Sequence, residues 1–114
     1  MARISFEGIG EVMATFGAKS GLESGMVCKM TGSGEVGACS AGERFCGLAD
    51  YVDDGLAAVQ VGGFTPMSYS GAVTAGWAKL VTDGNGGVKV DATNGVEYLV
   101  VEVDSTEKIA TILL

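Results

Sequence analysis

The stretch Gly34–Gly71, GEVGACSAGERFCGLADYVDDGLAAVQVGGFTPMSYSG, decides the fold of this 114-residue chain. Short apolar runs in it are separated by glycine-containing turns, which is the pattern of consecutive antiparallel strands. The runs are Val36 to Cys39, Phe45 to Val52, Leu56 to Val61 and Phe64 to Tyr69. We therefore predict an all-β fold, a single small glycine-rich antiparallel β-barrel or sandwich of about seven to nine short strands around one core.

Two features near the end of this stretch predict where a sheet ends. Gly62-Gly63 allows a bulge or a sharp bend. Pro66, the only proline, has no backbone N–H to donate, so we expect Phe64 to Tyr69 to form an edge strand or a bulged strand. An edge strand in a small protein must be covered or paired, and assembly with a partner is one way to do so.

The last third of the chain predicts three further strands, at Val88 to Asp91, Glu97 to Asp104 and Lys108 to Leu114. In the second of them we expect Leu99, Val101 and Val103 to point inward. The last strand is apolar on both faces, with Ile112 and Leu114 on one of them. This hairpin is therefore expected to be central to the barrel or part of a subunit contact.

The N-terminal part is ambiguous between a strand and a helical face. Glycines at positions 8, 10 and 17 each lower helix stability by about 1 kcal/mol relative to alanine, which favours an extended arm or edge strand. We therefore assign residues 1–24 to an N-terminal arm or edge strand with a loop, and residues 25–114 to the barrel domain. Trp77 has two interpretations, a core plug or an exposed interface anchor.

The composition excludes several classes of function. Seven basic and fourteen acidic residues give a net charge of −7, which disfavours binding to nucleic acid or to an anionic membrane. The absence of histidine disfavours general acid–base catalysis near neutral pH and many zinc and copper sites. The N-terminus lacks the apolar run of a signal peptide, and no apolar run reaches the roughly 18 residues of a spanning helix, so we expect synthesis in the cytoplasm.

The three cysteines, Cys28, Cys39 and Cys46, form no Cys-x-x-Cys motif. We expect free thiols that act as small buried apolar side chains, with a Cys39–Cys46 disulfide or a reactive thiol as the alternative.

Three weaker motifs favour ordinary structure. The loop Asp83 to Gly87 resembles the start of a calcium loop, but Asn94 stands where an EF-hand needs glutamate, so a hairpin turn is expected. Lys29, in Val27-Cys-Lys-Met30, is similar to the attachment lysine of biotinyl domains, yet it lies in a strand-like run. The scattered carboxylates lack the aromatic-rich cleft that glycoside hydrolysis needs. We expect no catalytic residue, metal or cofactor.

The order of segments in Gly34–Gly71 resembles that of the head-decoration, or capsid cement, proteins of tailed phages. The resemblance rests on the CSAGERFCG segment Cys39–Gly47, the Asp53-Asp54-Gly55 turn and the AAVQVGGFTPMSYSG strand pair Ala57–Gly71, and it spans roughly Gly25 to Val90. It implies a non-enzymatic virion protein that sits on the capsid exterior, commonly as a homotrimer. It further implies that the partner is the major capsid protein, whose neighbouring subunits it clamps together.

The family pattern transfers no individual contact residue, so the candidate interface is chosen from the sequence alone. It comprises Ile4, Phe6, Ile9, Phe64, Pro66, Trp77, Ile112 and Leu114. We expect the N-terminal segment, Ala2 to Phe16, to add a strand to the capsid by edge pairing. Two alternative hypotheses are another phage structural β-domain, from a tail or baseplate, and a small carrier or ligand-binding β-domain.

Overall fold

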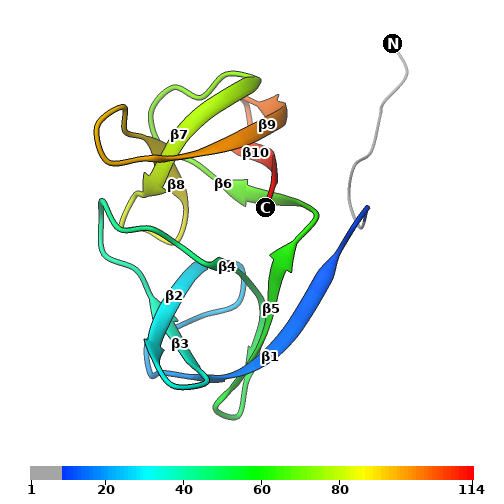
Figure 1. The fold of residues 1–114 in the computed structure, drawn as a ribbon, viewed down its shortest axis with the longest axis vertical. Helices are drawn as coiled ribbons and strands as arrows, with labels where there is room; N and C mark the ends of the chain where they lie inside the picture. Colours follow the sequence, from blue (N-terminus) through cyan, green and yellow to red (C-terminus); the bar gives the residue numbers. More distant parts are fainter. Residues whose placement is uncertain (1–8) are drawn as a thin grey trace.

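A computed structural model describes residues 9–114, which form ten β-strands and no helix in that range. Five strands close a barrel: β1 (Val12–Ala18), β2 (Val27–Gly32), β3 (Glu35–Ala38), β4 (Gly47–Asp53) and β5 (Leu56–Gly62). Five more form a second sheet: β6 (Phe64–Ser68), β7 (Gly76–Thr82), β8 (Val88–Val90), β9 (Val96–Asp104) and β10 (Ile109–Leu113). Figure 1 shows the barrel below and the second sheet above. The all-β prediction is confirmed.

The strand count exceeds the expected seven to nine because Val12–Ala18 is a full barrel strand. β1 pairs antiparallel with β5, from Val12 opposite Gly62 to Gly17 opposite Leu56, and parallel with β3 at Gly17 and Ala18. It thereby closes the barrel in the order β1-β3-β2-β4-β5. Within residues 1–24, predicted as an arm or edge strand with a loop, Val12–Ala18 is therefore a strand of the barrel.

The second sheet has the order β6-β10-β9-β7-β8, and β6 is an edge strand as Pro66 predicted. The two edges of this sheet approach each other. Tyr69, directly after β6, forms a parallel bridge with Val88 in β8, and the Ser70 N–H donates to the Val88 carbonyl at 2.9 Å. The sheet is therefore strongly curled around its own core.

The molecule has two core clusters where one was expected. The barrel interior contains Leu22, Cys28, Val36, Ala49, Ala57 and Val59. The second cluster joins residues of the upper sheet, such as Leu80, Val100 and Ile112, to Val27, Phe45 and Leu48 from the barrel side. Successive side chains of a strand point to opposite faces, so β2 and β4 contribute to both clusters. These two strands hold the halves of the molecule together.

The expected inward face of β9 is corrected by a β-bulge. Thr111 of β10 pairs with Glu102, and Ile112 pairs with Val100, so Val101 is the extra residue. Before the bulge, Val100 is fully buried and Leu99 is only partly buried, which is the reverse of the prediction for Leu99. After the bulge the alternation is reset, and Val103 packs against the core as predicted.

The bend at Gly62-Gly63 carries the chain from the barrel into the second sheet. Gly63 has φ 84°, and a methyl group added to it would lie 2.5 Å from the carbonyl carbon and oxygen of Gly10. The Leu114 N–H donates to the Gly63 carbonyl at 2.9 Å, and the Phe64 N–H donates to the Ile9 carbonyl at 3.1 Å. Ile9 and Gly10, the bend at Gly63 and the C-terminal Leu114 therefore meet at one point.

Substituting Gly63→Ala tests this contact against Gly71→Ala. Both glycines have positive φ, which costs an alanine about 1–2 kcal/mol, but a methyl group at Gly71 would meet no atom within 4 Å. We expect Gly63→Ala to lower the free energy of unfolding by at least about 2 kcal/mol more than Gly71→Ala, measured by urea denaturation. Equal losses would show that the backbone contact does not constrain the fold.

Candidate functional site

The outer face of the five-stranded sheet carries apolar residues aligned across four strands. Phe64 in β6 lies opposite Leu113 in β10, Leu113 opposite Leu99 in β9, and Leu99 opposite Trp77 in β7. We call these four residues the apolar row. Neighbouring strands are about 4.8 Å apart, so the row runs about 14 Å across the sheet. It brings together two residues that the sequence predicted, Phe64 and Trp77, and two that it did not.

Trp77 is 68% exposed, so its interpretation as a core plug is wrong. The other three members of the row are partly buried. An exposed tryptophan at the end of an apolar row has the properties of an interface anchor. Burying such an anchor in a partner typically contributes about 2 kcal/mol or more to binding.

Residues around the row extend the surface and give it a polar border. Pro66 is exposed on the same face of β6, and Ile109 of β10 is 37% exposed. Directly beyond Trp77, Lys79 lies opposite Glu97, and both are exposed. An apolar centre with a charged rim is the usual arrangement of a protein–protein interface.

Ile9 lies beside the Phe64 end of the apolar row. Its carbonyl accepts the Phe64 N–H, and its side chain is 53% exposed. The two other residues predicted for the N-terminal contact, Ile4 and Phe6, lie outside the described residues. Ile9 is thus the described residue of the N-terminal contact that lies next to the row.

Ile112 is a core residue and not part of an accessible interface. Its exposed fraction is 0%, because it lies on the inner face of β10 opposite Val100. Leu114 is half-buried and packs against the same core. The apolar residues on both faces of the last strand indicated that its outer face, too, would be buried or covered. The sequence alone did not show that Leu113 and Leu99 lie on that outer face and Ile112 on the inner face.

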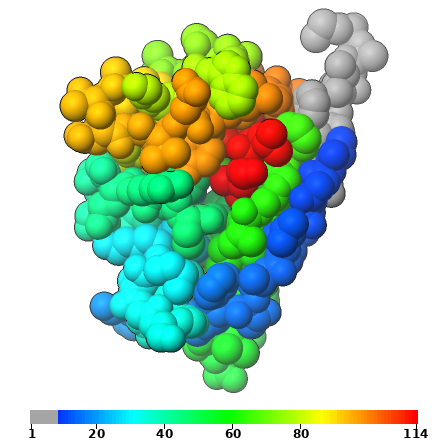
Figure 2. Space-filling model, viewed as in Figure 1, coloured from blue at the N-terminus to red at the C-terminus, as the bar shows by residue number. Residues whose placement is uncertain are grey.

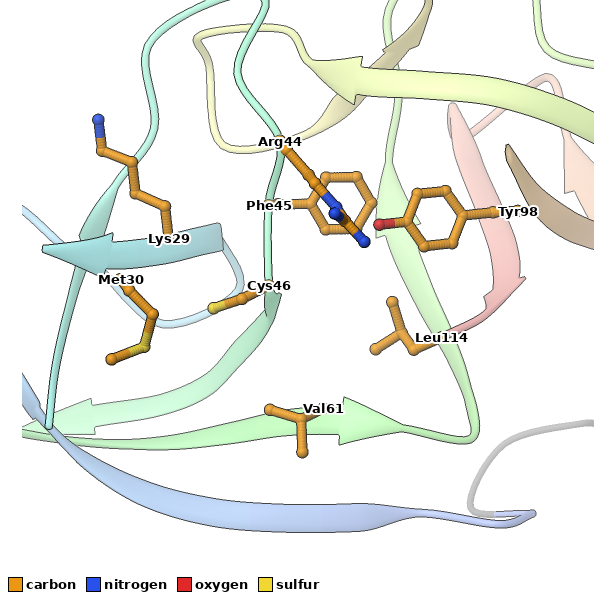
Figure 3. Close-up of a pocket in the computed structure, with 8 residues that line it drawn as sticks. All are labelled: Lys29, Met30, Arg44, Phe45, Cys46, Val61, Tyr98 and Leu114. Atoms are coloured by element: carbon orange, nitrogen blue, oxygen red, sulfur yellow. The ribbon is translucent and has the colours of Figure 1, made fainter. Parts of the chain in front are cut away.

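A groove of about 470 Å³ separates the barrel from the second sheet. Figure 3 shows its lining, which consists of Lys29, Met30, Arg44, Phe45, Cys46, Val61, Tyr98 and Leu114. The rings of Phe45 and Tyr98 stack with centroids 5.0 Å apart and an interplanar angle of 19°. In Figure 2 the groove lies where the teal, orange, red and green segments meet. The stack of Phe45 on Tyr98 joins the loop before β4 to β9 across this groove.

Lys29 is held by an ion pair at the rim of the groove. Its Nζ donates to both carboxylate oxygens of Glu43, at 2.9 and 2.7 Å. This interaction, assisted by the Ser40 N–H, holds the pKa of the Glu43 carboxyl below its usual value. A carrier-domain lysine would stand free at a hairpin tip, whereas Lys29 lies within β2 and is paired. The geometry therefore disfavours a carrier attachment site here.

The Asp83 loop is a hydrogen-bonded turn. Asp83 Oδ1 accepts the N–H groups of Asn85 and Gly87, at 2.7 and 3.1 Å, and Oδ2 accepts the Ser70 hydroxyl at 2.6 Å. Its carboxylate oxygens are thus used within the fold. Across residues 9–114, no group of three or more cysteine or acidic side chains has an arrangement that could hold a metal ion.

No protein-family model matches this chain, and no curated protein matches it. Separately, the described part of the chain has no helix with the length and apolarity needed to cross a membrane.

Proposed function

We propose that this protein is a non-enzymatic virion protein that binds the outer surface of a phage capsid. There it stabilises the shell by bridging subunits of the major capsid protein. The observation that carries the proposal is the apolar row on the outer face of the second sheet, with Trp77 exposed at its end. The resemblance of Gly34–Gly71 to head-decoration proteins supports the choice of partner.

The size of the row supports a cooperative mode of binding. A row about 14 Å long is smaller than a standard interface, which buries about 800 Å² on each partner. A single copy would therefore bind weakly through the row alone. A homotrimer presents three rows at once, so contacts that are weak singly add across the shell. This is the behaviour required of a cement that must resist outward pressure from packaged DNA.

The charge distribution is compatible with this role. The four residues of the apolar row carry no charge, although the chain as a whole carries −7. The contact surface can therefore be buried without desolvating an unpaired charge, which would be costly. The acidic remainder keeps a heavily decorated particle soluble.

The N-terminal segment supplies the second contact in this proposal. Residues 2–8 precede Ile9, whose carbonyl is bonded to Phe64 at the end of the row. Adding these residues as a strand to an exposed sheet edge of the capsid protein would provide main-chain hydrogen bonds without a preformed pocket. The row and the segment would then bind adjacent areas of one capsid surface.

Trp77→Asp tests the row, with Tyr51→Asp as the matched control. Tyr51 is also an exposed aromatic residue, at 61%, but it lies on β4 of the barrel. We expect Trp77→Asp to weaken binding to undecorated expanded capsids by at least about tenfold in a co-sedimentation assay, because it removes an interface anchor. Tyr51→Asp should bind as the unmodified protein does, and both variants should keep its melting temperature.

Equal binding by the two variants would contradict a role for the row. Binding of the unmodified protein to tails or baseplates, and not to capsids, would instead identify it as a component of those structures.

Deleting residues 2–8 tests the N-terminal contact. The deletion must end before Val12, because β1 is part of the barrel and its loss would unfold the protein. We expect the shortened chain to keep its melting temperature and to bind capsids more weakly, since it loses the added strand. Unchanged affinity in the same co-sedimentation assay would show that the segment is not an anchor.

A further inference from the structure

Cys28 and Cys46 are backbone neighbours at the junction of β2 and β4. The Cys46 N–H donates to the Cys28 carbonyl at 2.8 Å, and Cys28 is also the register partner of Gly47. This hydrogen bond places the backbones of Cys28 and Cys46 in direct contact, although Cys46 is one residue before the register partner Gly47. Disulfide-linked cysteines have Cα atoms about 4.4–6.8 Å apart, and direct backbone contact of this kind is what such a spacing requires.

The two thiols lie in different environments. Cys28 is fully buried in the barrel core, and its thiol donates to the Gly47 carbonyl at 3.6 Å. Cys46 is an exposed residue that lines the groove between the barrel and the second sheet. One thiol is therefore accessible to a solute, and the other is accessible only to its neighbour.

The interaction between these thiols also shifts their two pKa values in opposite directions. Proximity to the Cys28 thiol lowers the pKa of Cys46 to about 7, and the same interaction together with burial raises the pKa of Cys28. Cys46 is therefore more readily ionised to the nucleophilic thiolate than an ordinary cysteine is. The titratable and charged groups around it are Cys28 and Lys29 on β2, Cys39 after β3, Tyr98 on β9, and Glu43 and Arg44 in its own segment.

Cys39 differs from both of them and serves as an internal control. Burial raises the pKa of its thiol to about 11, and the thiol donates to the Val27 carbonyl at 3.8 Å. The Cys39 thiol is therefore harder to ionise than the Cys46 thiol. The earlier alternative of a Cys39–Cys46 disulfide is less favoured than one that includes Cys28.

We propose that Cys46 is a site of thiol–disulfide exchange with low-molecular-weight disulfides such as oxidised glutathione, and that Cys28 resolves the adduct into an intramolecular Cys28–Cys46 disulfide. This modification site is independent of the proposed capsid function. It needs no partner protein, and its test does not involve capsids.

The exchange has two balanced steps. The Cys46 thiolate attacks one sulfur of oxidised glutathione, the S–S bond breaks, and a glutathione thiolate leaves and takes up a proton. Cys28 Sγ then attacks Cys46 Sγ, the bond between Cys46 and glutathione breaks, and the departing glutathione thiolate takes up the proton that Cys28 loses. The two protein thiols lose two electrons, and oxidised glutathione gains them to give two thiols. The second step is the slower one because the Cys28 thiol is hard to ionise.

A Cys28–Cys46 disulfide would cross-link β2 to the start of β4, the two strands that contribute to both cores. The cross-link would lie beside the Phe45–Tyr98 stack, which spans the groove between the barrel and the second sheet. A reducing cytoplasm keeps the thiols free, and an oxidising exterior closes the bridge. Closing a loop of this kind restricts the unfolded chain, so oxidation is expected to raise the melting temperature.

The test is to incubate the full-length protein with oxidised glutathione over about pH 6–9 and to follow intact mass, with peptide mapping of the product. We expect a product that has lost two hydrogen atoms, a Cys28–Cys46 cross-linked peptide, and a higher melting temperature. The rate should rise with pH and level off above the pKa of Cys46. Cys39→Ser should react as the unmodified chain does, Cys46→Ser should not react, and Cys28→Ala should stop at the glutathione adduct of Cys46.

Three results would overturn the proposal. They are a stable glutathione adduct on the unmodified chain, a cross-link that includes Cys39, and undiminished reaction of Cys46→Ser. Because Cys28→Ala alters the barrel core and could unfold the protein, the peptide map of the unmodified chain decides the matter without that variant.

Discussion

The contact between the backbones of Gly63 and Gly10 is the constraint on which the rest of this structure depends. It lets the chain turn from the last barrel strand directly into the edge strand of the second sheet, with φ 84° at Gly63. Hydrogen bonds from Leu114 to Gly63 and from Phe64 to Ile9 fix both ends of the described chain at the same bend. A side chain at Gly63 would force these segments apart, so the relation between the barrel and the sheet rests on a glycine.

That bend also determines which surface is offered to a partner. It starts β6 with Phe64 on the outer face of the sheet, while the inner face is filled by a core that reaches into the barrel. Because β2 and β4 serve both cores, the two halves cannot readily slide past each other. The apolar row therefore lies on a stiff support, which the proposed bridging of capsid subunits would require. A rigid surface loses little conformational entropy when it binds.

Local patterns in the sequence predicted the strands well, because alternation and glycine turns are visible over a few residues. Pro66 correctly predicted the edge strand. Pairing between distant segments was not predictable in the same way: Val12–Ala18 becomes a barrel strand only through its partners β3 and β5. Simple alternation along β9 predicted Leu99 on the inner face. The bulge at Val101 shifts the alternation, so Leu99 lies on the outer face instead. Ile112 was predicted as an interface residue but is buried. Its exposure depends on which face of the sheet is packed against the core, and the sequence of β10, apolar on both faces, does not show this.

We propose that many copies of this protein decorate one shell. The most direct measurement is quantitative mass spectrometry of purified phage particles or capsids from the source strain, with this polypeptide measured against the major shell protein. The account predicts a copy number comparable to that of the shell protein, and release of this protein by mild treatment that leaves the shells intact. Absence from the particles, or only a few copies in each, would contradict it.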